Sequence, residues 1–167
     1  KILWEEDLTK FIQEKGQWGR YLDVDGDGIP YRTVIGNRHP QSAYFTRGTG
    51  HDDFARYSED PVVWEKTMAR LKKKMEYAKK LVPTPVIKKK DGAKIGIIAY
   101  GSSDAAVIEA CDQMAAQGLA VDYLRLRAVP FTDEVGEFIR THEKIYVVEL
   151  NRDGQMRQIL LVNYPEY

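Results

Sequence analysis

The second half of the chain alternates apolar, strand-like runs with helical segments, and this alternation constrains the fold more than any other feature. The runs at 94–100, 121–127 and 145–150 read as strands, and the first is a continuous apolar run of the kind that is buried on both faces. Helical patterns lie between them, at 104–118 and from about Thr132 to His142. Because the connections are short, this order predicts an open parallel sheet, which is an α/β fold. A third helical pattern follows, and since the chain stops within it we expect the sheet to lack at least one closing strand.

Ligands and partners of open parallel sheets gather at the carboxyl ends of the strands. The first predicted strand is followed there by Gly101, Ser102 and Ser103, which lead into a helix. Amide groups at such a junction hold phosphates, but a single glycine without the GxGxxG pattern favours an ordinary serine cap over a dinucleotide site. Further candidates for an interface or an anion site follow the third strand: Asn151, Arg152, Asp153 and Gln155.

The first part of the chain has a different texture. Residues 1–60 are a loop-rich segment of Gly, Asp and aromatic residues, broken by turn dipeptides. Asp60 as a cap and Pro83 after the last turn predict a long linking helix over 61–82. We expect its apolar residues to bury one narrow stripe: Trp64, Met68, Leu71, Met75, Ala78 and Val82. The lysines on its other faces indicate a solvated surface, and PTPVIKKKDG reads as a linker up to residue 93.

Charge and cysteine content narrow the classes of partner. Lys plus Arg and Asp plus Glu both total 25, so no net charge draws the chain to nucleic acid or to a membrane surface. No apolar run approaches the roughly 20 residues of a membrane span. Cys111 is the single cysteine, which excludes an internal disulfide. An iron–sulfur cluster or a structural zinc needs several such ligands, so we expect no metal site and a reducing cytoplasm. Both Cys111 and His142 read as packing residues of their helices.

One acidic stretch resembles the start of a calcium-binding loop, with Asp23, Asp25, Asp27 and Gly28 at the required spacing. The rest of that pattern fails, because Val34 stands where a bidentate glutamate is needed. We therefore interpret the stretch as a tight turn rich in Asp and Gly.

The sequence TRGTGHDD, residues 46–53, is the strongest candidate for chemistry. Its two glycines permit a sharp backbone path, and Arg47 offers a planar fork for a carboxylate. His51 beside Asp52 makes a plausible oriented imidazole. Neighbours in sequence need not face each other, so a functional loop and a structural turn both remain open.

Strings along the whole chain resemble one family. The stretches DGDGIPYRTVIGNRHP, AYFTRGTGHDDFARYSEDP, GSSDAAVIEA, VDYLRLRAVPFTDEVGEFI and VVELNRDGQMRQILLVN are similar to the later part of the alpha subunit of 2-oxoacid:ferredoxin oxidoreductases, particularly the 2-oxoglutarate enzymes. The resemblance covers essentially all 167 residues in one order. It implies that residues 94–167 form an incomplete domain similar to the carboxyl-terminal domain of transketolase. Residues 1–60 then match the tail of a preceding pyrophosphate-type domain, and 61–93 link the two.

The resemblance also implies a reaction. Alpha and beta subunits of this family convert a 2-oxoacid and coenzyme A to acyl-CoA and carbon dioxide, and pass electrons to ferredoxin. Thiamine diphosphate and an iron–sulfur cluster sit mainly on the beta subunit, so we expect this fragment to bind no cofactor alone and to be inactive alone. Its expected contribution is a subunit interface and one substrate-facing loop.

Within that loop, the resemblance implies that Arg47 and His51 neutralise a substrate carboxylate, with Thr49 beside them and Asp52 orienting them. Candidates for an additional basic group toward the distal carboxylate are Arg32 and Arg38. In one alternative, Arg47 and Asp52 form a salt bridge that only supports the turn. In another, the chain is a free-standing module of the same fold that binds an anion or a nucleotide without catalysis.

Overall fold

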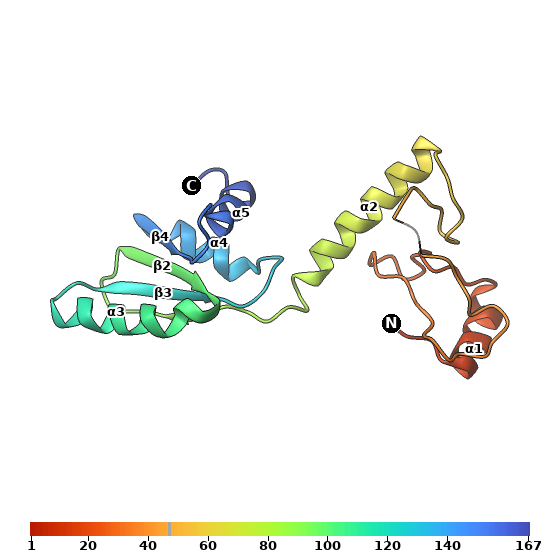
Figure 1. The fold of residues 1–167 in the computed structure, drawn as a ribbon, viewed down its shortest axis with the longest axis horizontal. Coiled ribbons are helices and arrows are strands. Elements are labelled where there is room, and N and C mark those ends of the chain that lie inside the picture. The colour runs from red at the N-terminus through yellow and green to blue at the C-terminus, as the bar shows by residue number, and fades with distance from the viewer. Residues whose placement is uncertain (47) are drawn as a thin grey trace. The chain divides into compact units, whose positions relative to one another are not determined.

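The computed structural model describes residues 1–46 and 48–167. The chain divides into two compact units, Lys1–Ala78 and Lys79–Tyr167 (Figure 1). Each unit has its own core of buried apolar side chains. None of the helices in the described part of the chain is long and apolar enough to cross a membrane.

The second unit is built around a four-stranded sheet in the order β1-β3-β2-β4. Its strands are β1 (Val86–Lys88), β2 (Ile95–Tyr100), β3 (Val121–Leu126) and β4 (Lys144–Val148). The central strand β2 runs parallel to both neighbours, so that Ile97 lies opposite Tyr123 of β3 and Tyr146 of β4. Only β1 is antiparallel. The predicted α/β class with an open, mostly parallel sheet is confirmed.

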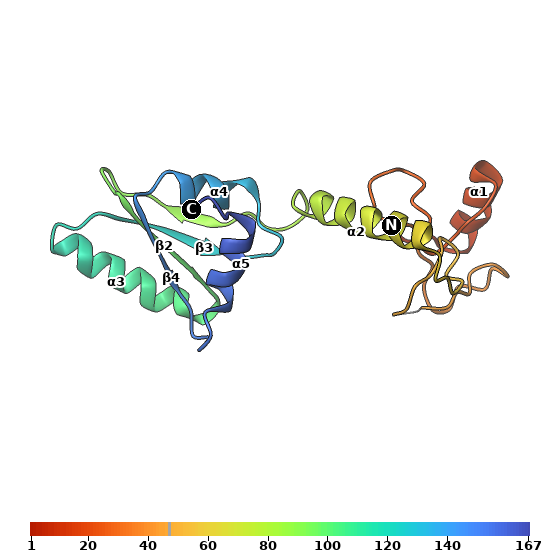
Figure 2. The same cartoon turned by 90° about the horizontal axis from the view of Figure 1, so that it is seen from above.

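Helices cover both faces of this sheet (Figures 1 and 2). After a 3-10 turn η1 (Gly101–Ser103), α3 (Asp104–Ala116) packs on one face, and α4 (Asp133–Arg140) and α5 (Gln155–Asn163) pack on the other. Alternate residues of β2 divide between the two layers. Ala99 packs with Val107 of α3, whereas Ile98 packs with Phe138 of α4. Burial on both faces explains why the strand is a continuous apolar run.

The stretch expected to be a linker contains a strand. Val86 and Ile87 pair with Arg125 and Leu124 along the outer edge of β3. Both are β-branched residues, which fit the pleated surface of an edge strand. The three-residue strand is too short for its pattern to stand out among prolines and lysines, and the long-range pairing with β3 decides its structure.

The helix α2 (Pro61–Ala78) is shorter than the predicted span of 61–82. Pro83 lacks the amide hydrogen that would bond the Lys79 carbonyl, and it disfavours helical geometry at the preceding residue. The expected buried stripe is also wrong, because no residue of α2 is fully buried in its unit. Trp64 and Met75, for example, are 57% and 58% exposed.

His142 packs in the core as expected, and it is also tied to a carboxylate. Its ring lies on Phe138 with centroids 4.3 Å apart, and its Nδ1 is 2.6 Å from the Phe138 carbonyl oxygen. Its Nε2 lies 3.2 Å from Asp122 Oδ2, and the other carboxylate oxygen accepts the Lys90 amide hydrogen at 2.8 Å. Both side chains are almost fully enclosed. Asp122 therefore joins the segment after β1 to β3 and to the end of α4.

The first unit has one small core around α1 (Glu5–Lys15). Leu8 and Phe11, three positions apart on the helix, face Leu3 and Tyr31. The helix ends at Gly16, whose backbone adopts the left-handed conformation that glycine accepts without strain. Much of the remaining unit consists of turns, so hydrogen bonds and close backbone contacts fix its shape.

The acidic stretch at 23–28 is a turn held by its own protein partners. Lys1 Nζ lies 2.7 Å from both Asp25 Oδ2 and Asp27 Oδ2, and this hydrogen bonding holds the pKa of both carboxyls below its usual value. Asp23 Oδ2 accepts the Gly28 amide hydrogen at 2.9 Å. No group of three metal-ligating side chains suited to a cation is found in the described part of the chain. These contacts fit the turn interpretation. A metal cation would have to compete with the Lys1 ammonium group for the carboxylates of Asp25 and Asp27.

The end of this turn packs directly on the backbone of α2. A Cβ atom on Gly28 would lie 2.5 Å from the Lys74 amide nitrogen and 2.8 Å from the Arg70 carbonyl oxygen. Its φ of +81° is also one that other residues adopt only at a cost. Gly28 is therefore required where the loop-rich segment meets the helix.

We predict that Gly28→Ala destabilises the chain by about 2–4 kcal/mol, because strain at positive φ adds to overlap with α2. Gly16→Ala is the matched control, since its φ of +79° is similar but no atom lies within 4 Å of the added Cβ. It should cost about 1–2 kcal/mol. Urea unfolding measures both, and equal losses would contradict the close contact.

We predict that Asp122→Ala lowers the free energy of unfolding by about 2–4 kcal/mol, because it leaves the Lys90 amide and the buried His142 ring without their acceptor. Asp112→Ala, at an exposed position of α3, should change it by less than about 0.5 kcal/mol. Urea unfolding compares the two variants. A loss for Asp122→Ala no larger than that of the control would show that the carboxylate is not needed.

Candidate functional site

From Gly50 onward, the TRGTGHDD segment is a tightly built turn. Ser58 donates its amide hydrogen to the Gly50 carbonyl at 3.1 Å, and His51 bridges Tyr57 in antiparallel fashion. Asp52 closes the turn, because its Oδ1 accepts the amide hydrogens of Phe54 and Arg56, each at 2.9 Å. A Cβ atom on Gly50 would overlap the Ser58 carbonyl oxygen. Asp52 and Gly50 thus have a sufficient structural explanation.

The His51 side chain is held by Thr49 and Tyr21, not by the adjacent Asp52. Its Nδ1 lies 2.9 Å from the Thr49 carbonyl oxygen, so this nitrogen carries a hydrogen and donates it. Its ring packs on Tyr21 with centroids 4.0 Å apart. The expectation that Asp52 orients the imidazole is therefore replaced by orientation through Thr49 and Tyr21. The Nε2 atom is enclosed and has no hydrogen-bond partner among the described residues.

A cavity of about 270 Å³ lies between this loop and α2. On the loop side it is lined by Gly48, Thr49, Gly50, His51 and Ser58. The helix side carries Trp64, Thr67, Met68, Arg70 and Leu71, and Tyr21 completes the lining. Two of the predicted loop residues, Thr49 and His51, thus share one cavity.

Sequence reasoning missed the helix side of this cavity. The spacing of Trp64, Met68 and Leu71 was visible, but it was assigned to core burial. Arg70 is one of several basic residues on the helix, so the sequence did not distinguish it from them. No local pattern relates it to Tyr21, which is distant in the sequence. The packing of the 23–28 turn on α2, the ion pair of Lys66 with Asp53 and the contact of Arg70 with Tyr21 bring these segments together.

The other predicted basic residues do not join the cavity. Arg32 and Arg38 are exposed and contribute no side chain to its lining. The Arg32 amide bonds the Lys1 carbonyl, and the Arg38 amide donates to Glu5 Oε1 at 2.6 Å. Arg47 lies outside the described residues.

The carboxyl edge of the sheet carries its own carboxylates. Glu149 accepts the amide hydrogens of Met156 and Arg157 at the start of α5, at 3.0 and 3.3 Å. At the start of α3, Asp104 accepts from Tyr123 Oη at 2.7 Å, and its second oxygen lies 3.1 Å from Arg125 Nη1. An external anion would meet negative charge at both helix ends.

The predicted interface residues at this edge are engaged locally. Asn151 Nδ2 donates to Gln155 Oε1 at 2.8 Å, and Arg152 pairs with the adjacent Asp153. Ser103 is buried, whereas Ser102 is exposed. The contacts fit a local turn before α5, and they leave an interface role for these residues as a hypothesis.

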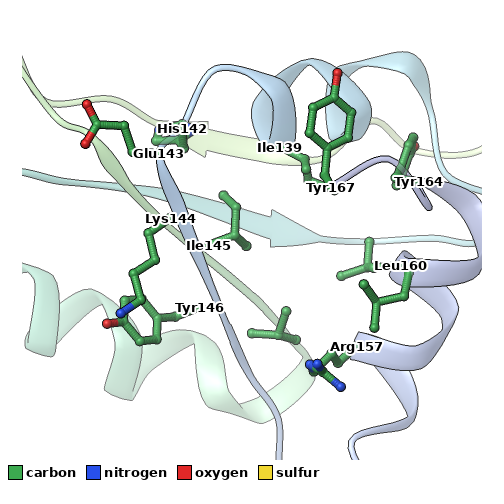
Figure 3. Close-up of a pocket in the computed structure, with 12 residues that line it drawn as sticks. Ile139, His142, Glu143, Lys144, Ile145, Tyr146, Arg157, Leu160, Tyr164 and Tyr167 are labelled. Carbon is green, nitrogen blue, oxygen red and sulfur yellow. The ribbon is translucent and has the colours of Figure 1, made fainter.

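A second cavity, of about 540 Å³, lies along the end strand β4 (Figure 3). Ile145 of β4, Leu160 of α5 and Ile139 of α4 contribute apolar surface to it. None of the predicted site residues lines this cavity. It is therefore separate from the candidate site on the first unit.

Comparison with known proteins places these features in a family context. No protein-family model matches the chain. Over 146 residues it is 26% identical to the alpha subunit of 2-oxoacid:ferredoxin oxidoreductase 2 from Aeropyrum pernix, a match that covers 84% of this chain and 22% of that relative. The chain is similar to an oxidoreductase alpha subunit. It spans about a fifth of the length of that relative.

A solved structure shares the fold of this alpha-subunit-like chain. It is the 2-oxoglutarate:ferredoxin oxidoreductase from Magnetococcus marinus, with 2-oxoglutarate, coenzyme A and succinyl-CoA bound. The match has a TM-score of 0.75 at 23% sequence identity, and it covers 89% of this chain and 26% of that one. The similarity extends over most of the chain in sequence and in fold, so the resemblance drawn from the sequence is confirmed.

In this alpha-subunit-like chain, we predict that Asp52→Ala loosens the turn at 50–58 and costs about 1 kcal/mol, because two backbone amides lose their acceptor. Asp53→Ala is the control, since it removes only an ion pair with the exposed Lys66 and should cost less than about 0.5 kcal/mol. Amide hydrogen exchange should become faster at Phe54 and Arg56 in the first variant only. Unchanged exchange there would argue against Asp52 as the residue that closes the turn.

Proposed function

We propose that the chain is part of the alpha subunit of a 2-oxoacid:ferredoxin oxidoreductase. The observation that carries the proposal is the sequence similarity to one such alpha subunit over 84% of the chain. The shared fold over 89% of the chain supports it independently. The whole enzyme converts a 2-oxoacid and coenzyme A to acyl-CoA, carbon dioxide and reduced ferredoxin, together with a beta subunit, in the cytoplasm.

The substrate we propose is 2-oxoglutarate. The structural neighbour from Magnetococcus marinus binds 2-oxoglutarate, coenzyme A and succinyl-CoA, which supports this choice. In the proposed arrangement residues 94–167 form the domain that resembles the transketolase carboxyl-terminal domain. Residues 1–60 are the tail of the preceding domain, and residues 61–93 link the two.

The donor atoms of this chain do not suit the cofactors of such an enzyme. An iron–sulfur cluster needs several thiolates, and the sequence holds only Cys111, which packs against the α3 face of the sheet. Burial raises the pKa of that thiol, which opposes its use as a ligand. A diphosphate would meet Glu149 and Asp104 at the helix ends described above. These donor atoms agree with the family resemblance, which assigns thiamine diphosphate and the cluster mainly to the beta subunit.

The contribution of this chain to the reaction is the loop at 46–53. We propose that Thr49 and His51 face the 2-oxoacid in the assembled enzyme, with Arg47 added on sequence grounds. The cavity beneath the loop supports this role, because it combines an imidazole, hydroxyl groups and an apolar wall. Asp52 contributes by holding the turn in shape.

The rival function, a free-standing anion-binding module, needs accessible helix ends at the sheet edge. Glu149 and Asp104 oppose it, since carboxylates already occupy the start of α5 and the first turn of α3. The exposed apolar side chains of α2, among them Val62, Trp64 and Met75, also favour a part of a larger assembly.

We predict that His51→Gln lowers kcat/KM for 2-oxoglutarate by roughly tenfold or more in the complex of full-length alpha and beta subunits, since a positioned imidazole is lost. Arg47→Ala should lower it by roughly a hundredfold. His39→Gln, which lies outside the cavity, should retain the wild-type value. Ferredoxin reduction in the presence of coenzyme A is the readout.

The same assay with pyruvate tests the substrate choice. Faster turnover of pyruvate than of 2-oxoglutarate by the wild-type complex would contradict the proposed substrate but keep the reaction class. No turnover of any 2-oxoacid by an assembled complex would overturn the family function. Wild-type rates in both His51→Gln and Arg47→Ala would show that the loop has a structural role only and does not contact the substrate.

A further inference from the structure

Three nitrogen-bearing side chains converge on the ring of Tyr21. The Arg20 guanidinium lies 5.0 Å from its centroid, the Arg70 guanidinium 5.8 Å, and the His51 ring 4.0 Å. They come from different parts of the first unit: the segment after α1, the helix α2 and the 46–53 loop. Arg20 also lies over Tyr44, at 5.4 Å, so aromatic rings hold its position.

Arg70 is a half-buried cation with unused donors. Its Nη1 donates to the Gly28 carbonyl at 3.3 Å, which uses one of the five guanidinium N–H groups. No carboxylate among the described residues forms an ion pair with it. Burial lowers the pKa of this guanidinium, while the more distant charges of Asp23 and Asp53 act in the opposite direction.

Neither of the two acidic residues near Arg70 forms an ion pair with it. Asp53 pairs with Lys66, and Asp23 Oδ2 accepts the Gly28 amide hydrogen, while Asp23 Oδ1 is enclosed and has no hydrogen-bond partner among the described residues. A partly desolvated guanidinium is stabilised most by a carboxylate that meets its planar fork. Arg70 lines the cavity, so an acceptor from outside the chain can supply that partner there.

The rest of the cavity suits a small acid. Its lining includes the hydroxyl-bearing residues Thr49, Ser58 and Thr67 and the apolar residues Trp64, Met68 and Leu71. Its volume of about 270 Å³ lies just below the range of drug-sized ligand pockets, which is about 300–1,000 Å³, so it suits a smaller molecule. This combination matches a short carbon chain that ends in a carboxylate.

We propose that this cavity binds the carboxylate of a small organic acid and that Arg70 is the group that binds it. The identification of the acid as the 2-oxoacid substrate rests on the proposed function, whereas the site itself rests on the geometry. Arg70 thereby takes the role that sequence reasoning gave to Arg32 and Arg38. Arg20 adds positive charge beside Tyr21 without lining this cavity.

The test uses the complex of full-length alpha and beta subunits with Arg70→Gln, Arg70→Lys and the control Lys72→Gln. Lys72 is an exposed cation on the same helix and lies outside the cavity. We expect Arg70→Gln to raise KM for 2-oxoglutarate by roughly ten- to a hundredfold with kcat changed by less than about threefold, because ground-state binding is lost. Arg70→Lys should fall between, and Lys72→Gln should match the wild type.

A second readout does not depend on turnover. Glutarate, a dicarboxylate without the reacting carbonyl, should raise the unfolding temperature of the wild-type and Lys72→Gln complexes but not of Arg70→Gln. In the wild-type complex, glutarate should also protect Arg70 from modification by phenylglyoxal, as mapped by mass spectrometry. This protection experiment needs no variant, so it stands even where Arg70→Gln does not assemble.

The outcomes separate the site from the function. Normal turnover with a wild-type KM in Arg70→Gln and no protection of Arg70 by glutarate would overturn the site and leave the function intact. No turnover by the wild-type complex, together with protection of Arg70 by glutarate, would contradict the proposed oxidoreductase function and support the carboxylate-binding site. A purely structural role for Arg70 predicts loss of assembly in Arg70→Gln without any protection by glutarate.

Discussion

The contact between the Asp23–Gly28 turn and α2 is the constraint on which the first unit depends. This unit has only a small apolar core around α1, and no residue of α2 is fully buried. Without a deep core, the position of the helix is set where Gly28 meets the backbone of Lys74 and Arg70. The carboxylates of the turn are in turn fixed by Lys1 and by backbone amides. The walls of the cavity therefore come together through a glycine and a set of ion pairs more than through hydrophobic burial.

The second unit reaches stability by the opposite route. Its central strands are covered on both faces, and its cores contain fully buried residues such as Ile98 and Leu124. The buried carboxylate inside it, Asp122, is paired with His142 and the Lys90 amide. A rigid sheet whose helix ends are already neutralised is suited to serve as a scaffold. The candidate loop and its cavity lie in the loop-rich first unit, although open α/β sheets commonly bind ligands at the strand ends.

Most of the fold of the second unit could be predicted, because its longer elements have sequence patterns that are recognisable locally. Continuous apolar strands and amphipathic helices of ordinary length have patterns that hold regardless of context, as at Ile95–Tyr100 and Asp133–Arg140. The short strand Val86–Lys88 has no such signal, since its structure is decided by the edge of β3. The burial of α2 was mispredicted for a related reason. Periodicity identifies an apolar stripe, but it does not say whether the surface that covers the stripe belongs to the same unit.

The candidate site shows the same limit at the level of single residues. His51 and Thr49 were found because their loop has an unusual composition, and the structure lines one cavity with both. Asp52 was assigned to orient His51 because the two are adjacent, yet adjacent side chains in an extended segment point to opposite sides. Its carboxylate instead closes the turn, and the Thr49 carbonyl holds the imidazole. The segment from Gly50 onward is thus both a turn and part of a candidate binding loop, because the carboxylate of Asp52 closes the turn while the His51 ring packs on Tyr21 and lines the cavity.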